Sequence, residues 1–176
     1  MRSDSSAASP VPVLRSSRLM LRPLCVADHA SLLAMANDVD VTRYLHEGPP
    51  PSAEEMLNRV TRAIGQWERR GYGMMAVEDV SGFVGRMGVF QLADDTEPLL
   101  VYVLCRSGWG KGYATEAVPL ILEWMRTMHG TEQLLAHIDP RNTASTRIAA
   151  KLGGFRRGTV DRAGTMLDLW VFPTKR

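Results

Sequence analysis

Three glycines spaced two residues apart stand in the segment 106–116, which reads RSGWGKGYATE. Gly108, Gly110 and Gly112 permit backbone conformations that other residues resist, and they let a ligand approach the chain closely. The segment leads into an apolar-periodic stretch typical of a helix, whose first N–H groups have no helical partner and lie at the positive end of the helix dipole. A turn of this kind favours a phosphate group.

Two familiar phosphate-binding motifs do not fit this segment. A P-loop needs a glycine five positions before its Gly-Lys pair and a Ser or Thr after it, where this chain has Cys105 and Gly112. A dinucleotide fingerprint that begins at Gly108 needs a glycine where Tyr113 stands. The segment is therefore a phosphate-binding turn of a third kind. The small Ala114, the Thr115 hydroxyl and the Lys111 ammonium can support such a ligand.

A buried strand and an amphipathic helix position the turn. A strand is expected over 98–105, and its residues 99–104 are nearly continuously apolar, as expected for a strand that is covered on both faces. Apolar residues recur on one helical face from about 112 to 128. Pro119 is expected to bend the early turns of this helix, because it removes one helical hydrogen bond.

The remaining elements follow from apolar period and cap residues. Asp28 is expected to cap a helix that ends near Asn37, and Ser52 with Glu55 forms a capping box for a helix that ends at Gly71. A last helix runs from its cap Asn142 to the glycines at 153–154. Strands are expected over 18–24, 73–78, 82–91, 133–138, 155–160 and 165–172. The order of strands and helices predicts an α+β fold.

Composition and charge limit the possible functions. The chain has 176 residues and a formal net charge of +2, without a basic run, which argues against nucleic acid as a partner. No segment approaches the roughly 18 apolar residues of a membrane span, so we expect no membrane partner. Cys25 and Cys105 are isolated, which favours a reducing, cytoplasmic location, and no metal is expected. Residues 1–13 are predicted to be a disordered tail before one domain over 14–176.

Beyond these arguments, the chain resembles the GNAT superfamily of N-acetyltransferases, in particular its Rim-type, ribosomal-protein-alanine acetyltransferase-like branch. The resemblance covers roughly 17–172 and rests on 109–117 (WGKGYATEA) and on 139–145 (DPRNTAS), which continues to 151–155 (KLGGF). It implies a single GNAT-type domain. Its central mixed sheet would be mostly antiparallel, with a parallel, splayed fourth and fifth strand and helices on both faces.

The resemblance also implies how acetyl-CoA, as co-substrate, would bind. Its pantetheine arm would enter between the splayed strands and bond to the backbone of Tyr102 and Leu104. Asn142 would bond the arm, and Ser145 would lie near the sulfur. The loop begins with Trp109, a candidate cofactor-binding residue that either shapes the loop or packs beneath it; we expect packing. The pyrophosphate would be held by the amides of Gly110, Lys111, Gly112, Tyr113, Ala114 and Thr115.

The catalytic groups are less well defined. Many GNAT relatives carry a glutamate on the fourth strand, but Pro98 and Leu99 occupy the matching positions. Glu97 next to them, His137 on the following strand, or a water molecule are the alternatives for a general base. The tyrosine that relatives often use as proton donor corresponds to Ala149, which leaves Ser145 as the candidate donor. Cys105 is interpreted as an inert, buried thiol.

The resemblance implies transfer of an acetyl group to a primary amine by direct attack, with a protein N-terminus or a small molecule as acceptor. The alternative is a non-catalytic acyl-CoA-binding or sensing module of the same fold. The family usually builds its acceptor pocket between the two early helices, where Tyr44, His46 and Glu47 lie. These three are interpreted as ordinary loop residues, and the alternative is that they select the acceptor. A monomer or a homodimer is expected.

Overall fold

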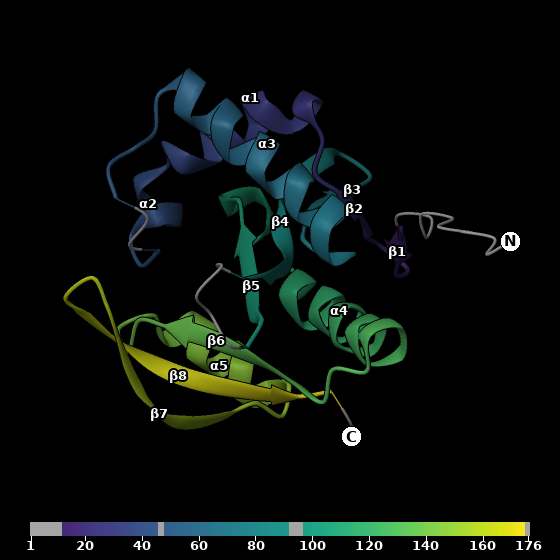
Figure 1. Cartoon of the computed structure of the whole chain (residues 1–176). Helices are drawn as coiled ribbons and strands as arrows, with labels where there is room; N and C mark the ends of the chain where they lie inside the picture. Colours follow the sequence, from purple (N-terminus) through teal and green to yellow (C-terminus); the bar gives the residue numbers. More distant parts are fainter. Residues whose placement is uncertain (1–11, 46–47, 92–96, 175–176) are drawn as a thin grey trace, which may run out of the picture.

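The computed structural model describes residues 12–45, 48–91 and 97–174. All strands in these ranges lie in one eight-stranded sheet with the order β1-β2-β3-β4-β5-β6-β8-β7 (Figure 1). The strands are β1 (Leu14–Arg15), β2 (Met20–Pro23), β3 (Met74–Asp79), β4 (Gly82–Phe90), β5 (Leu99–Leu104), β6 (Gln133–Ile138), β7 (Phe155–Arg162) and β8 (Thr165–Pro173). The helices are α1 (His29–Ala36), α2 (Val39–Thr42), α3 (Ala53–Arg70), α4 (Tyr113–His129) and α5 (Thr143–Lys151), with short 3-10 helices η1 (Val26–Asp28) and η2 (Arg106–Gly108).

The sheet is antiparallel at every neighbouring pair except β5 and β6, which are parallel. This confirms the predicted mixed, mostly antiparallel sheet and its parallel central pair. The predicted order of elements is also found. The structure adds the short β1 and α2, which contain two and four residues and are too short to show a periodic pattern.

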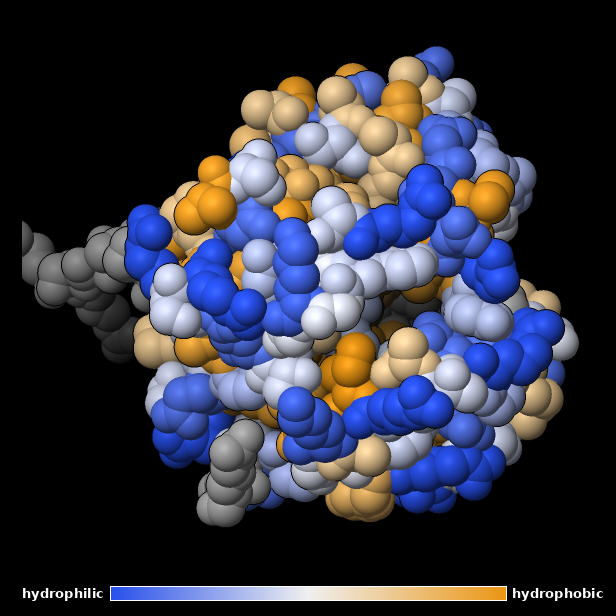
Figure 2. Space-filling view, turned by 180° about the vertical axis from the view of Figure 1, so that it is seen from behind, coloured by the Kyte–Doolittle hydropathy of each residue, from blue (hydrophilic) through white to orange (hydrophobic). Residues whose placement is uncertain are grey.

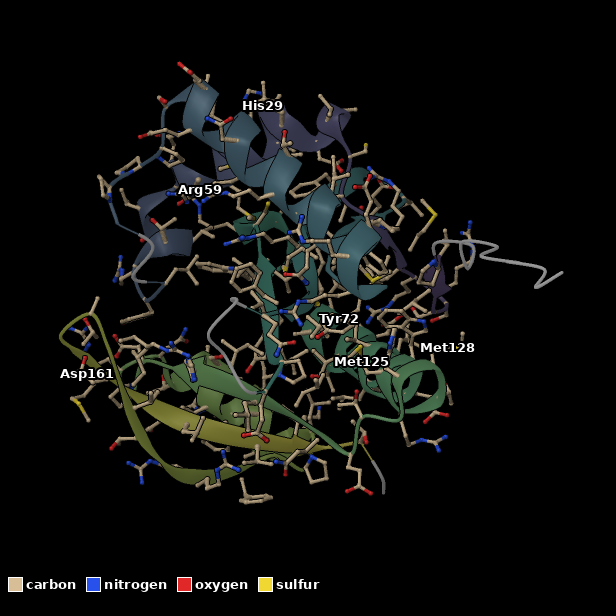
Figure 3. The ribbon with its side chains drawn as sticks, in the orientation of Figure 1. His29, Arg59, Tyr72, Met125, Met128 and Asp161 are labelled. Atoms are coloured by element: carbon tan, nitrogen blue, oxygen red, sulfur yellow. The ribbon has the colours of Figure 1, made fainter. Side chains whose placement is uncertain are left out.

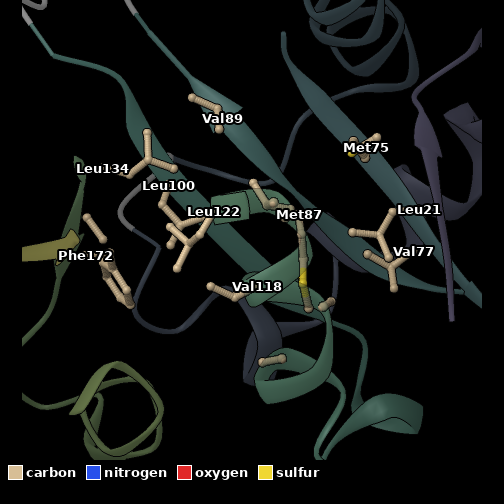
Figure 4. Packing of buried hydrophobic residues seen from close by; sticks show 14 of the residues in the cluster. Leu21, Met75, Val77, Met87, Val89, Leu100, Val118, Leu122, Leu134 and Phe172 are labelled. Carbon is tan, nitrogen blue, oxygen red and sulfur yellow. The ribbon is translucent and has the colours of Figure 1, made fainter. Parts of the chain in front are cut away.

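Helices cover both faces of the sheet, as predicted. On one face, α4 and α5 close a core that includes Met87, Val118, Leu134 and Phe172 (Figure 4). On the other face, α1 and α3 pack over a second core that includes Val60 and Val103. The strand β5 contributes to both cores, because Leu100 belongs to the first and Val103 to the second. The prediction that both faces of this strand are covered is therefore confirmed.

The caps of α3 agree with the sequence prediction. The Ser52 Oγ accepts the Glu55 N–H at 3.2 Å, and Glu55 Oε2 accepts the Ser52 N–H at 2.7 Å, which completes the capping box. At the other end, Gly71 adopts a left-handed φ of 71° and donates its N–H to Trp67 O. The apolar face of α3 packs on the sheet through Met56, Val60 and Trp67.

The early part of the chain differs from the prediction at Asp28. The Asp28 side chain does not cap α1: its carboxylate accepts the Cys25 N–H at 2.8 Å and both terminal nitrogens of Arg22 at 2.7 and 2.9 Å. Because a guanidinium binds a buried carboxylate more strongly than a single amide does, Asp28 connects β2 to the start of the helix instead. The predicted tail over 1–13 lies, up to residue 11, outside the described residues.

Candidate functional site

The strands β5 and β6 are paired at one position only. Leu99 is opposite Leu135, and the Leu135 N–H donates to Pro98 O at 3.2 Å. Beyond this pair the remaining residues of both strands have no partner in the other strand. The sheet is therefore open along the second half of β5, on the side from which the glycine turn begins.

The backbone of β5 presents hydrogen-bonding groups to this opening. Cys105 donates its N–H to Val84 O at 2.9 Å, so the odd-numbered residues of β5 bond to β4. In an antiparallel pair the alternate residues turn their N–H and C=O groups to the other side. Tyr102 and Leu104 therefore face the opening, which agrees with the backbone role that the resemblance implies for them.

Trp109 does not pack beneath the turn, so that prediction is wrong. Its side chain is 48% exposed, and its indole N–H donates to Leu104 O at 2.9 Å. An indole needs a partner for its N–H, and the last carbonyl of β5 supplies one at the surface. This bond occupies the Leu104 carbonyl and leaves its N–H for a ligand.

The turn itself has the geometry that a phosphate requires. Gly110 and Gly112 have left-handed φ values of 71° and 78°, and the first helical bond runs from the Glu116 N–H to Gly112 O at 3.1 Å. Within the part of the chain that the structure describes, no amide from 110 to 115 donates a hydrogen bond to the protein. These amides lie at the first turn of the 17-residue helix α4, at the positive end of its dipole.

Charged side chains surround the turn. Arg18 makes an ion pair with Glu116 in which its Nε, at 2.8 Å, and its Nη2 both donate to Oε2, and its guanidinium lies 5.0 Å from the centre of the Tyr113 ring. The Tyr113 hydroxyl donates to Asp79 Oδ2 at 2.9 Å, and the Lys111 ammonium is 4.0 Å from the same oxygen. Sequence reasoning missed the Arg18–Glu116 pair, because no local pattern connects residues 98 positions apart.

A second group of polar side chains lies where α5 meets the open strand. Asn142 caps α5 by accepting the Ser145 N–H at 3.1 Å, so its side-chain oxygen is used while its NH₂ group is left to donate. The Ser145 hydroxyl donates to the Tyr102 hydroxyl at 2.9 Å, and the Tyr102 hydroxyl donates to Ser145 O at 3.2 Å. Tyr102 and Ser145 therefore form one hydrogen-bonded pair across the opening.

The Tyr102 hydroxyl was not predicted to pair with Ser145, although a tyrosine in an apolar strand indicates a hydroxyl that must find a partner. Its ring packs edge-on against Phe172 with centroids 6.4 Å apart. Burial raises the pKa of Tyr102 to about 12, against a smaller opposing effect of the hydrogen bond from Ser145. The phenol is thus protonated at neutral pH. Ala149 is fully buried in the same core, and no hydroxyl replaces the tyrosine of relatives at that position.

Glu97 lies at the closed end of the opening, directly before Pro98. Its carboxylate accepts a hydrogen bond from Gln133 Nε2 at 2.7 Å and one from Arg157 at 3.3 Å. Gln133 and His137 alternate along β6 with residues of the α4 core, so they belong to the opposite face. The structure therefore places Glu97 beside the α1–α3 face of the sheet, opposite the Tyr102–Ser145 pair.

His137 lies two residues beyond Leu135 on the same face, where β6 has already parted from β5. Its Nδ1 accepts a hydrogen bond from Arg162 Nε at 3.3 Å. Because an arginine Nε can only donate, the imidazole in this arrangement carries its proton on Nε2. The ring is thereby set to donate from Nε2, which disfavours that nitrogen as a general base.

Of the three residues noted between the early helices, only Tyr44 lies within the described ranges; His46 and Glu47 lie outside them. The Arg141 guanidinium is 5.9 Å from the centre of the half-buried Tyr44 ring. Arg141 is itself held by Asp139, at 2.7 and 3.0 Å, in the turn after β6. Tyr44 thus connects the helices of one half of the molecule to the start of α5.

Cys105 is half-buried, and desolvation raises its pKa. A thiol in such surroundings is a poor nucleophile, which agrees with the inert role predicted for it. Over the described ranges, every helix is too short or too polar to cross a bilayer.

A sequence model of the acetyltransferase (GNAT) domain matches residues 18–154. Among similar proteins, the uncharacterized protein YkkB of Bacillus subtilis (strain 168) is 33% identical over 150 residues, which cover 80% of this chain and 83% of YkkB. The uncharacterized N-acetyltransferase p20 of Bacillus licheniformis is 25% identical over 168 residues, which cover 90% of this chain and 93% of p20. The chain is therefore an acyltransferase. It belongs to the GNAT acetyltransferase family.

Solved structures share the fold. An acetyltransferase from Agrobacterium tumefaciens str. C58 superposes with a TM-score of 0.80 at 22% identity, covering 92% of this chain and 94% of that one. The ribosomal L7/L12 alpha-N-protein acetyltransferase RimL in complex with coenzyme A gives 0.80 at 16% identity, covering 92% and 98%. The presence of RimL among these structures is consistent with the Rim-type resemblance.

Proposed function

We propose that the protein transfers the acetyl group of acetyl-CoA to a primary amine, either a protein N-terminus or a small molecule, by direct attack. One observation carries this proposal. The opening beside β5 exposes the backbone groups of Tyr102 and the N–H of Leu104, and it leads to six amides, 110–115, that donate to no described protein group. A pantetheine arm and a pyrophosphate need such a series of sites in this order, and coenzyme A is bound in the RimL complex of the same fold.

The position of each polar group suggests its role. With the arm along β5 and the pyrophosphate at the turn, the thioester would lie in the opening, between the two faces of the sheet. Tyr102 and Ser145 on the α4–α5 side would protonate or stabilise the departing thiolate. Because the Ser145 hydroxyl donates its proton to the Tyr102 oxygen, this hydrogen bond must break before Ser145 can donate to the thiolate.

The amine would enter from the α1–α3 side, so that it attacks the carbonyl carbon while the thiolate leaves toward the other face. A base on that side must take one proton from the amine. Glu97 or water remains for this role, because the bond from Arg162 sets His137 to donate from Nε2. In such a direct attack, most of the rate enhancement comes from holding the amine and the thioester in the right geometry. Membership of an acetyltransferase family favours this enzyme over a non-catalytic acyl-CoA sensor.

The first test is thermal unfolding with and without acetyl-CoA. At a concentration of about 100 times Kd, a ligand that binds only the folded state adds about 2.7 kcal/mol, which raises Tm by roughly 5–10 °C for a chain of this size. ATP carries phosphates but no pantetheine arm, so it should raise Tm much less. No shift with millimolar acetyl-CoA would contradict the proposal.

Gly112→Leu with Gly130→Leu as its control tests the turn itself. Both glycines have left-handed φ values, 78° and 63°, at opposite ends of α4, and both have room for a Cβ. Each leucine should therefore cost a similar 1–2 kcal/mol or so of stability. Only Gly112→Leu should abolish the acetyl-CoA shift. Release of free thiol with a panel of peptides and small amines then measures transfer.

A further inference from the structure

A pocket of about 440 Å³ lies between the N-terminal helices and the β7–β8 hairpin. The two walls are far apart in the sequence and come from opposite halves of the molecule (Figure 1). Figure 2 shows the surface hollowed on this side, with hydrophilic residues along the rim. Its lining residues are Ala36, Thr42, Arg43, Gly48, Pro49, Pro50, Pro51, Arg59, Arg162, Ala163 and Thr165.

The lining of this pocket is basic. Arg43 follows α2, Arg59 is on α3 and Arg162 ends β7, while the described residues of the lining include no carboxylate. Figure 3 shows Arg59 below α3 on the side of α2, with Asp161 across from it near the tip of the hairpin. Arg43 is 58% exposed and pairs with Asp40 at 2.5 Å. Arg59 and Arg162 make further contacts within the protein, so an anion would join existing interactions.

The wall of the pocket is stiff. Three consecutive prolines, 49–51, form part of it, and each has a fixed φ. Opposite them, Ala163 and Gly164 turn the hairpin with positive φ values of 51° and 83°, and Asp161 accepts the Gly164 N–H at 2.7 Å. A pocket wall that is fixed before binding loses less conformational entropy when a ligand enters than a mobile loop does.

Arg162 joins the pocket to the opening in the sheet. Its Nε donates to His137 Nδ1 at 3.3 Å, and His137 stands on β6 just past the last pair with β5. The pocket therefore adjoins the α1–α3 side of the opening, from which an amine would approach. If the amine of an acceptor reaches the thioester, the acceptor atoms that lie a few bonds from the nitrogen would be beside these arginines.

We propose that the pocket binds a carboxylate of the acceptor, so that the preferred substrates are primary amines that carry an acidic group a few bonds from the nitrogen. This inference rests on the proposed acetyl transfer. A carboxylate suits the site because it accepts two parallel N–H bonds from one guanidinium, whereas an amide group has a single acceptor oxygen. Its source is either an acidic side chain near a peptide N-terminus or the carboxylate of a small amino acid.

The test compares acceptors that differ only in this group, at saturating acetyl-CoA. One pair is a tetrapeptide amide with Asp or Asn in its second position, and the other is 4-aminobutanoate and 4-aminobutanamide. A charge-assisted pair should raise kcat/KM at least about tenfold for the acid over its amide, and less at 0.5 M salt. The pair that shows the larger ratio identifies the source.

Variants assign the effect to the pocket. Arg43→Gln and Arg59→Gln should each reduce the acid-over-amide ratio severalfold while activity toward the neutral acceptors is kept. Arg69→Gln, an exposed position near the end of the same helix α3, is the control and should leave the ratio unchanged. Arg43 is exposed, so its variant folds even if Arg59→Gln does not.

Equal rates for acid and amide, or an unchanged ratio in Arg43→Gln, would overturn the inference and leave acetyl transfer intact. If no acceptor turns over although acetyl-CoA raises Tm, binding of the same compounds to the CoA-loaded protein is measured by calorimetry. A preference for the acids supports the inference there, and equal binding overturns it. Failure of acetyl-CoA itself to bind would instead refute the proposed function.

Discussion

The ion pair between Arg18 and Glu116 gives a sharp test of how the turn tolerates a diphosphate. Glu116 lies in the first turn of α4, where a carboxylate would repel the ligand. Hydrogen bonds from Ser16 and Arg18 lower the pKa of Glu116, so it is ionised at neutral pH. Arg18 Nη2 lies only 3.8 Å from where a Cβ on Gly112 would stand. We expect Arg18 to neutralise Glu116 at the point where the phosphates would bind.

The size of the effect follows from Coulomb's law. Two unit charges about 8 Å apart interact by about 2 kcal/mol at an effective dielectric constant near 20, and by about 0.5 kcal/mol in water. Arg18→Met should therefore weaken acetyl-CoA binding by roughly 2- to 30-fold. Glu116→Gln should leave the affinity equal or tighter. The double variant should return close to the wild-type affinity, because the net local charge is again zero.

The assay is calorimetric titration of acetyl-CoA into the four proteins at 0.05 and 0.5 M salt, with urea unfolding of the apo proteins as a control for stability. The weakening in Arg18→Met should shrink at high salt, where the Debye length falls to a few ångströms. If the double variant binds as weakly as Arg18→Met alone, Arg18 acts by direct contact. In that case the neutralisation argument is wrong.

Three further predictions concern other sites. Tyr102→Phe and Ser145→Ala should each lower kcat about 10- to 100-fold and keep acetyl-CoA affinity within about twofold. Because the two residues act as one unit, the double variant should be no slower than either single variant. Additive losses in single-turnover rates would refute this. Burial would raise the pKa of Asp28, but hydrogen bonds from Arg22 and the Cys25 amide outweigh it and lower the pKa overall. The ionised Asp28 therefore stabilises the folded protein at pH values above the unfolded pKa of about 3.9. This stabilisation is lost as the pH falls through the lower pKa of the folded state. Asp28→Asn should thus cost about 2–4 kcal/mol in urea unfolding at pH 7 and progressively less below about pH 4; a constant cost would contradict the ion-pair role. Ala163→Asn should raise stability by about 0.5–1 kcal/mol, since asparagine tolerates the left-handed φ of 51° better than alanine, and a lower Tm would show that the turn is not strained.

The sequence predicted the long elements well, because each carries many repeats of its period. Strand β6 was predicted over the residues that form it, 133–138, and α3 was predicted with both of its caps. The turn at 106–116 was recognised because glycines, a buried strand and a helix start are all local signals. The parallel pairing of β5 and β6 came from the resemblance, since periodicity does not fix strand partners.

The sequence predicted much less about the side chains that meet in space. The partners of Glu97 come from β6 and β7, 36 and 60 residues further along the chain. The bond from Trp109 to Leu104 depends on the direction of a side chain, which residue type alone does not set. The type and position of Tyr102 predict a strand residue, which is correct for its backbone. They do not predict that its hydroxyl pairs with Ser145.

The single backbone pair between β5 and β6 has a mechanical consequence. Hydrogen bonds of the main chain do not set the width of the opening, so the side chains that pack beneath it must do so. Leu100 lies on one strand, Leu134 on the other, and both belong to the core under α4 together with Phe172. Trimming a methyl group from this core changes the spacing of two strands as well as the packing. Substitutions in this core, remote from every polar group, can in this way change the affinity of the opening for a long, narrow ligand.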